Sequence, residues 1–345
     1  MKKLFAMLLA ACLVLGMLSA CGENAKPGDG SGSGSAAWKM AMITDTGGLG
    51  DNGFNDMAWA GMEMARDELG FEIGLIESTE ASQYAANIAA AASQGYNVIL
   101  CVGYLLADAL AEMAPQYPDV SFMIIDGSVE GDNVYSFVYS MEETSFLAGA
   151  LAAYVLPDCN TFGTVGGMEI PDVIAWANGY QAGVLAVKPE AKVLRSYVGS
   201  FVDPGIAKEL ALAQFNQGAE VVMEISSGGA IGVIEAAKEA GKKFIATDKS
   251  KDSQAPGCEL TAALAGRDMA VYNAAKQLKE GTAKPGIMNL TMKDGVFGLP
   301  DYTEELYGKD AADFIEGLKQ KILTGEIEVP RTNEEMDAYT PPVLS

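Results

Sequence analysis

Short apolar runs alternate with stretches of helical period through the first half of the chain. Each run is rich in Val, Ile and Leu and has the length of a buried strand. The stretches between them end at helix-stopping residues such as Gly70 and Gly95. The pattern predicts strands over 39–44, 71–76, 97–102, 121–125 and 134–139, and helices over 54–69, 82–93 and 106–117.

A second round of the same kind begins at residue 143. It predicts helices over 143–155, 174–186, 206–218 and 231–240, and strands over 161–165, 192–198, 220–225 and 243–247. Strands that alternate with helices form right-handed βαβ units around a parallel sheet that is buried on both faces. Two rounds of similar size predict an α/β protein with two Rossmann-like lobes. The amphipathic stretches 268–280 and 310–323 have no assigned place in either lobe.

The first 21 residues follow a different pattern. Two lysines precede an apolar run over 4–18 and two small residues, which is the layout of a secretory signal over 1–20. The run is shorter than the roughly 20 residues that a membrane span needs. Residues 18–21 (Leu-Ser-Ala-Cys) resemble the lipobox of bacterial lipoproteins, which implies lipidation of Cys21. With a flexible Gly/Ser-rich tether over 21–37, we expect a protein lipid-anchored to the outer face of the cytoplasmic membrane.

The composition narrows the classes of function. A net charge of −23 opposes binding to nucleic acid and to anionic lipid head groups. The absence of histidine removes the Ser-His-Asp and Cys-His nucleophile systems and the usual zinc ligands. We therefore expect a binding protein without metal or cofactor, not an enzyme, although Lys, Tyr or carboxylate chemistry stays open. Cys101 is expected in the core, and Cys159 and Cys258 either pair or stay free.

Polar residues follow the predicted strands, where ligands bind in open α/β sheets. Asp45, Asp126 and Asp248 each follow a strand at an equivalent position. One such aspartate is commonly a turn or N-cap residue, whereas three of them beside glycine-rich turns favour a polar cleft. Other polar stretches that follow strands are 46–56, 103–104, 166–168, 199–203 and 226–229.

Residues 48–53 have the spacing G-x-G-x-x-G between a strand and a helix, as in dinucleotide-binding folds. Asp45 and Asp51 flank the place where a pyrophosphate would lie, and like charges repel there. If a calcium-binding loop started at Asp45, its third and fifth positions would be Gly47 and Leu49, which lack the side-chain oxygens that bind calcium. We therefore expect neither a dinucleotide nor calcium.

Carboxylates beside an aromatic ring suit a neutral polyol that carries a flat group. Its hydroxyls donate to the carboxylates and its flat group stacks on the ring, whereas phosphorylated ligands are repelled. Phe54, Trp176 and Phe201 are candidate stacking residues, and each is equally well explained as a core residue.

Seven stretches carry a resemblance that runs from about residue 38 to 280: 43–55, 102–104, 117–119, 122–126, 165–168, 197–203 and 218–222. Together they resemble the basic membrane protein (BMP) family of ABC-transporter solute-binding lipoproteins, which includes purine nucleoside receptors. The resemblance implies a type I periplasmic-binding fold with a hinge and a ligand cleft between the lobes. It implies a first lobe of 38–140 plus about 261–290, and a second lobe of 141–260 plus about 291–345.

The resemblance also implies roles for residues. By analogy with the matching family residues, Asp45 and Thr46 would contact the base of the ligand, and Phe54 would stack on it. Asp126 and Asp248 would contact polar groups such as ribose hydroxyls. A lysine of the family is missing here, where Arg267 is the nearest cation, and a second stacking aromatic is replaced by Met223 or Ile225. The candidate ligand-binding residues are Asp45, Thr46, Asp51, Asn52, Phe54, Asn55, Asp126, Trp176, Ser227, Gly228 and Asp248.

We expect a solute-binding protein that captures a small neutral polar ligand, a purine nucleoside, by hinge closure. Its partners would be ABC permease subunits with a cytoplasmic ATPase. A pentose-type sugar as ligand, or a ligand sensor on the same fold, are the alternatives, and a nucleoside hydrolase is disfavoured.

Overall fold

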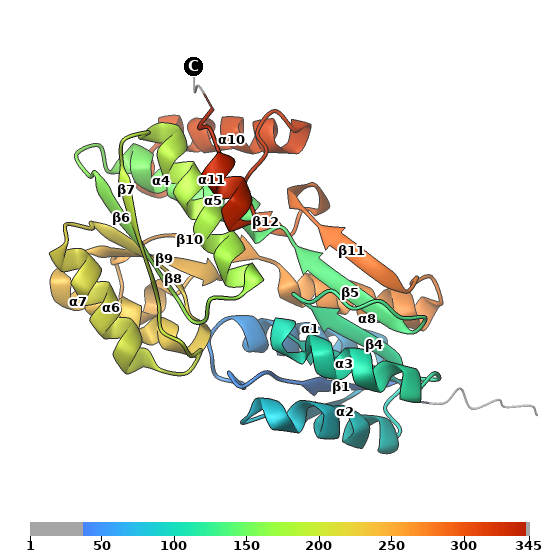
Figure 1. The fold of residues 1–345 in the computed structure, drawn as a ribbon. Coiled ribbons are helices and arrows are strands. Elements are labelled where there is room, and N and C mark those ends of the chain that lie inside the picture. Colours follow the sequence, from blue (N-terminus) through green and yellow to red (C-terminus); the bar gives the residue numbers. More distant parts are fainter. Residues whose placement is uncertain (1–36, 343–345) are drawn as a thin grey trace, which may run out of the picture. The chain divides into compact units, whose positions relative to one another are not determined.

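The computed structural model describes residues 37–342, so the predicted signal, the lipidated Cys21 and nearly all of the tether lie outside the described residues. Two six-stranded sheets organise the described part (Figure 1). The first lobe contains β1 Lys39–Ile43, α1 Phe54–Leu69, β2 Glu72–Ile76, α2 Tyr84–Ser93, β3 Val98–Val102, α3 Ala107–Met113, β4 Ser121–Ile125, β5 Val134–Tyr139, α8 Arg267–Glu280 and β11 Gly286–Leu290.

The first sheet is parallel throughout, with the order β11-β5-β4-β3-β1-β2. Strand side chains alternate between its two faces, and both faces are buried. Met40 and Met42 of β1 pack with α1 and α8, while Ala41 and Ile43 pack with α2 and α3. An uninterrupted apolar strand is therefore required, as the sequence pattern predicted. Helix α1 ends at Gly70, whose φ of 73° is the left-handed cap that glycine adopts most easily.

The second lobe repeats this arrangement around the sheet β12-β10-β9-β8-β6-β7. Its strands are parallel except β12, which runs antiparallel to β10. Helices α4 and α5 cover one face, and α6 and α7 cover the other. The elements are α4 Met141–Val155, β6 Thr161–Gly166, α5 Pro171–Val187, β7 Lys192–Tyr197, α6 Pro204–Asn216, β8 Val221–Ile225, α7 Ala230–Ala240, β9 Lys243–Asp248, β10 Glu259–Ala265, β12 Phe297–Gly298, α9 Thr303–Tyr307, α10 Lys309–Thr324 and α11 Asn333–Ala338.

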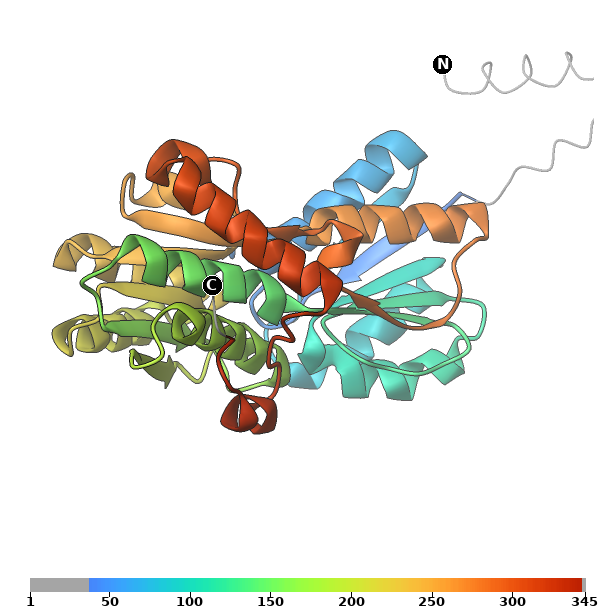
Figure 2. The ribbon, with the colours of Figure 1, turned by 90° about the horizontal axis from the view of Figure 1, so that it is seen from above.

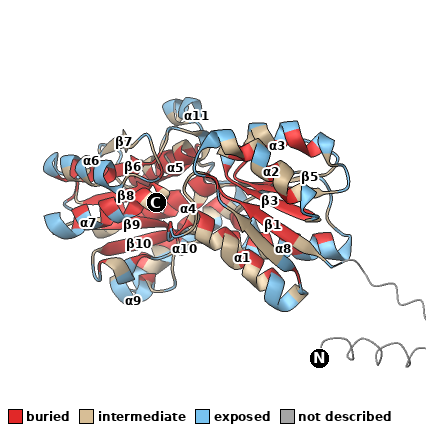
Figure 3. Cartoon of the chain, turned by 90° about the horizontal axis from the view of Figure 1, so that it is seen from below, coloured by how far each residue is buried: buried red, intermediate tan, exposed pale blue. Residues whose placement is uncertain are grey.

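Glycines let α4 and α5 approach each other closely. A Cβ atom added to Gly183 would lie 2.0 Å from the carbonyl oxygen of Phe146, and one added to Gly179 would lie 2.2 Å from that of Glu142. The two helices therefore pack backbone against backbone. Helix α10 lies along α4 on its outer side (Figure 2). In Figure 3 the central strands, such as β3 and β8, are buried, whereas the outer faces of α6 and α7 are exposed.

The chain passes between the lobes at three places: 139–141, 265–267 and 290–292. Ser140 N donates to the carbonyl of Leu290 at 2.8 Å, so the first and third crossings lie side by side. The family resemblance places residues from about 261 to 290 in the first lobe. Residues 259–265 instead form β10 of the second sheet, and the chain crosses back at Gly266.

Most predicted elements agree with the structure to within a few residues, and three strands were not predicted. Strand β10 (ELTAALA) is rich in alanine and lacks the β-branched residues that mark a strand, while β11 and β12 carry only a weak pattern. The cysteines of the described part, Cys101, Cys159 and Cys258, are free thiols, and Cys101 is buried within β3.

Candidate functional site

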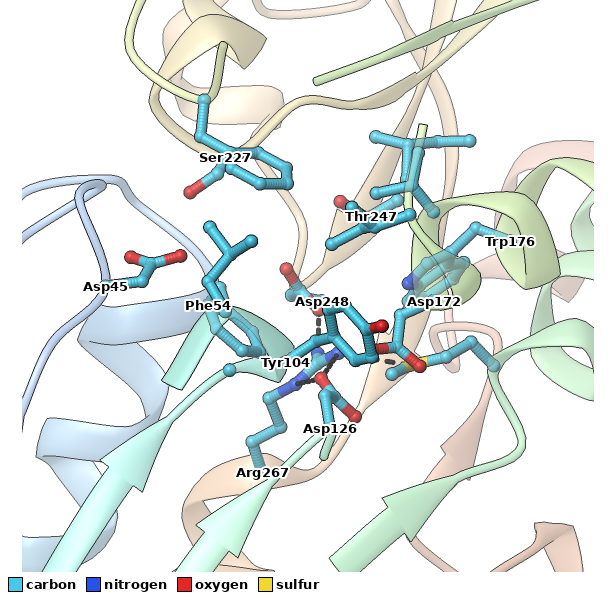
Figure 4. A pocket seen from close by; sticks show the side chains of 17 residues that line it. Asp45, Phe54, Tyr104, Asp126, Asp172, Trp176, Ser227, Thr247, Asp248 and Arg267 are labelled. Carbon is cyan, nitrogen blue, oxygen red and sulfur yellow. Dashed lines mark hydrogen bonds and ion pairs between the residues drawn. The ribbon is translucent and has the colours of Figure 1, made fainter. Parts of the chain in front are cut away.

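A pocket lies where the carboxyl ends of the two sheets face each other (Figure 4). It holds about 570 Å³ of space free of protein atoms, including the part open to solvent. Its lining residues are Asp45, Phe54, Gly103, Tyr104, Leu105, Asp126, Met141, Ile170, Asp172, Val173, Trp176, Phe201, Ile225, Ser227, Thr247, Asp248 and Arg267.

Strained backbone positions gather at this pocket. Asp126 directly follows β4, Ser227 follows β8 by two residues, and Asp248 ends β9. Their φ angles are 53°, 52° and 71°, a region that residues other than glycine seldom occupy. Such strain costs roughly 1–3 kcal/mol per residue and persists where the surrounding structure enforces it, commonly at functional sites. The turns after these strands therefore hold three polar side chains toward the same space.

Arg267 is the charged centre of the site, and it is almost fully buried. Its Nη2 donates to Asp126 Oδ2 at 2.8 Å and its Nε donates to the same oxygen at 3.1 Å, while Nη1 donates to Asp248 Oδ1. One cation thus joins Asp126, which follows β4 of the first lobe, to Asp248, which ends β9 of the second lobe. Burial raises the pKa of Asp126, and the charge of Arg267 opposes that rise.

Aromatic rings flank the same guanidinium group. Its central carbon lies 4.8 Å from the ring centroid of Phe54 and 5.4 Å from that of Tyr139. Both distances fit cation–π contacts. Arg267 opens α8 one residue after the chain crosses between the lobes, so the hinge itself carries the cation into the pocket.

The loop before α1 organises the opposite side of the site. Asp51 accepts hydrogen bonds from the backbone amides of Gly53 and Asn55 at 3.0 and 2.9 Å, and Asn55 Nδ2 donates to Asp45 Oδ1 at 2.9 Å. Burial raises the pKa of Asp45 to about 6, and the hydrogen bond from Asn55 opposes that rise. The glycine-rich loop is therefore held by an internal network of hydrogen bonds that Asp51 and Asn55 make.

A hydrogen bond across the cleft joins the two lobes at this loop. Ser227 Oγ, in the second lobe, donates to Asp51 Oδ2, in the first lobe, at 2.8 Å. Together with the bridge from Arg267 to Asp248, this contact holds the lobes against each other in the described structure.

The predicted site residues fall into two groups. Asp45, Phe54, Asp126, Trp176, Ser227 and Asp248 line the pocket, and so does Phe201. Asp51 and Asn55 lie behind it and hold the loop, while Thr46, Asn52 and Gly228 are not among the lining residues.

Other lining residues were not among the candidates, notably Tyr104, Asp172, Thr247 and Arg267. Tyr104 and Thr247 adjoin predicted strand ends, so their positions gave a usable signal. Asp172 lies in the first turn of α5, and Arg267 follows a crossing that the sequence pattern did not predict.

Across residues 37–342, no group of three or more His, Cys, Asp or Glu side chains is arranged to hold a metal ion. In the same range, no helix combines the length and the apolar character needed to cross a membrane.

Two α/β lobes, three crossings between them and a pocket at the facing strand ends define a two-lobed solute-binding protein. A family model described as "ABC transporter substrate-binding protein PnrA-like" matches residues 38–333. The chain belongs to this family, the Bmp family, as its sequence motifs indicated. The family consists of substrate-binding proteins of ABC transporters and not of enzymes.

Relatives and solved structures agree with this assignment. The chain is 30% identical to the ABC transporter nucleoside-binding protein BmpA of Lactococcus lactis, over 95% of this chain and 99% of that protein. It is 31% identical to an uncharacterised lipoprotein of Pyrococcus abyssi, over 89% of this chain and 79% of that one. The crystal structure of a solute-binding protein of an ABC transporter system from Aeropyrum pernix superposes with a TM-score of 0.81 at 28% identity, covering 87% of this chain and 96% of that one.

Proposed function

We propose that the pocket binds a purine nucleoside, and that the protein, anchored by a lipidated Cys21 on the outer face of the membrane, delivers it to the permease subunits of an ABC importer. The observation that carries the proposal is the unused oxygen of Asp126. Arg267 occupies Oδ2, while Oδ1 is buried and has no hydrogen-bond partner. A buried carboxylate oxygen calls for a donor, and a ligand hydroxyl can supply one.

The surroundings of that oxygen suit a ligand with hydroxyls at one end and a flat ring at the other. Phe54, Asp45 and Asp126 line the pocket from the first lobe, and Trp176 and Phe201 line it from the second lobe. Hydrogen bonds to charged groups contribute about 1.5–3 kcal/mol each, and stacking of a base contributes about 1–3 kcal/mol. A few such contacts, less the ordering cost, reach the roughly −8 kcal/mol of micromolar binding.

The charge of the lining supports an unphosphorylated ligand. The carboxylates of Asp45, Asp126 and Asp248 line the pocket, and Arg267 is the one cationic side chain among its lining residues. A phosphate group would face these carboxylates at short range, where like charges repel strongly. The nucleoside-binding relative in Lactococcus lactis gives separate support for a nucleoside as the ligand.

Hinge closure is the proposed mechanism of capture. The bridge made by Arg267 and the hydrogen bond from Ser227 to Asp51 can form only when the lobes meet. A ligand that contacts strand ends of both lobes favours this closed form and shifts the population toward it.

Calorimetric titration with inosine, guanosine and adenosine tests the proposal. We expect dissociation constants in the micromolar range or below, and a loss of affinity of about 5- to 150-fold in Phe54→Ala, since stacking contributes about 1–3 kcal/mol. Phe314→Ala is the matched control, because this ring stacks on Tyr154 and does not line the pocket. The absence of heat with all three nucleosides at high micromolar concentration would refute the assignment. Heat with D-ribose in their place would favour a pentose.

A further inference from the structure

The last segment of the chain brings a cation to the hinge. Arg331 precedes α11, and its Nη1 donates to the carbonyl oxygen of Tyr139 at 2.7 Å and to Glu142 Oε2 at 2.8 Å. Tyr139 belongs to the first crossing between the lobes, and Glu142 lies in the first turn of α4 directly after it. The backbone of Arg331 is held as well, since its carbonyl accepts a hydrogen bond from Asn178 Nδ2 at 3.0 Å.

The other end of the same guanidinium group reaches the wall of the pocket. Arg331 Nη2 donates to Asp172 Oδ1 at 3.1 Å, and Asp172 lines the pocket from the first turn of α5. Arg331 itself is not a lining residue. A single side chain therefore joins the hinge, the C-terminal segment and one carboxyl group of the ligand site.

We propose that Arg331 is a positioning residue of the ligand site: from outside the pocket its guanidinium group pairs with the carboxyl group of Asp172 and holds it in place. The C-terminal segment is then a working part of the site. The position of Arg331 before α11 is itself fixed, because Thr332 and Glu335 form a capping box at the start of that helix.

Four charged groups face Asp172 from the elements around it. Arg331 comes from the C-terminal segment, Arg267 from α8, Asp126 from the end of β4, and Glu142 from α4. Burial and the neighbouring charge of Asp126 raise the pKa of Asp172 to about 8, while the two arginines oppose the rise. Asp172 therefore changes charge near pH 8, and we expect loss of Arg331 to move that change to higher pH.

Trp176 reports on this group without any ligand. It lies one helical turn after Asp172 on α5, and both line the pocket. Trp38 and Trp59, the other two tryptophans of the chain, are replaced by phenylalanine so that the fluorescence comes from Trp176 alone. In this background we expect a fluorescence transition with a midpoint near pH 8. The transition should disappear in Asp172→Asn, and its loss there would assign the transition to the carboxyl group of Asp172.

In Arg331→Met the midpoint should rise by about one pH unit or more, as expected when an opposite charge at hydrogen-bonding distance is removed. Arg331→Lys keeps the charge and should shift the midpoint less. Arg195→Met is the matched control: Arg195 also contacts the C-terminal segment and α5, through Asn333, Asn178 and Gln181, but none of these carries a charge. Its midpoint should stay at the wild-type value.

Equal midpoints in the wild type and in Arg331→Met, or a transition that persists in Asp172→Asn, would overturn the proposal. If Arg331→Met does not fold, as judged by far-ultraviolet circular dichroism, Arg331→Gln takes its place, since it also removes the charge, and an unshifted midpoint in that variant would overturn the proposal in the same way. No ligand is added, so the result is independent of whether the site binds a nucleoside.

Discussion

Replacing Arg267 by methionine tests the charge arrangement of the site most directly. Methionine keeps much of the side-chain volume and removes the cation. Asp126 and Asp248, both buried, then lose the guanidinium group that pairs them. Removing one partner of a buried ion pair typically destabilises a protein by 3–5 kcal/mol, because a buried charge is left uncompensated. We expect a loss of about that size in the free energy of unfolding at pH 7.5.

The loss should depend on pH in a defined direction. Burial already raises the pKa of Asp126 above its unfolded value, and loss of Arg267 raises it further. Between the unfolded and folded pKa values the folded variant binds more protons than the unfolded chain, so its stability falls as pH rises. The deficit relative to wild type is therefore largest at pH 7.5. It shrinks toward pH 5 by up to about 1.4 kcal/mol per pH unit for each carboxyl group that is protonated in the folded state alone.

Urea unfolding followed by circular dichroism at both pH values measures the two quantities. Arg66→Met is the matched control, because Arg66 pairs with Glu63 and Asp67 on an exposed face of α1. Exposed pairs contribute about 0–1 kcal/mol, so this variant should differ little from wild type at either pH. A loss below about 1 kcal/mol in Arg267→Met at pH 7.5, or a loss of equal size at pH 5, would refute the reasoning.

Three further predictions concern closure, a second buried pair and helix packing. Ser227→Gly removes the hydroxyl that joins the lobes, at a backbone position (φ 52°) that glycine tolerates. The closed form should be less stable by about 1.5–3 kcal/mol relative to the open form. Small-angle scattering should show this as a larger radius of gyration. Lys251→Met leaves Glu224 buried without its partner at 2.6 Å and should cost about 3–5 kcal/mol in urea unfolding at neutral pH, whereas replacing both by methionine should recover most of it. Gly183→Ala forces a Cβ to 2.0 Å from a carbonyl oxygen and should lower the thermal midpoint, while Gly317→Ala on α10, with nothing within 4 Å, should raise it slightly.

How far the site could be predicted depended on how local its signals are. Asp45, Asp126 and Asp248 were identifiable because each directly follows an apolar strand, and parallel strands bring their carboxyl ends to one edge. The supporting role of Asn55 was not identifiable, since it depends on the fold of the loop around Asp51. The local sequence pattern thus indicated where the site is and part of the set of side chains that line it.

Local pattern determined the two α/β lobes of this protein, because strands buried on both faces must be apolar and the helices between them must be amphipathic. The tertiary structure alone decided that the alanine-rich β10 belongs to the second sheet, since pairing with β9, and not strand propensity, fixes it there. It also decided the charges of the pocket. Arg267 meets Asp126 across 141 positions of sequence, and Arg331 meets Asp172 across 159. Such pairs form only when the crossings between the lobes bring distant segments together. The spacing of residues along the chain does not indicate which segments those are.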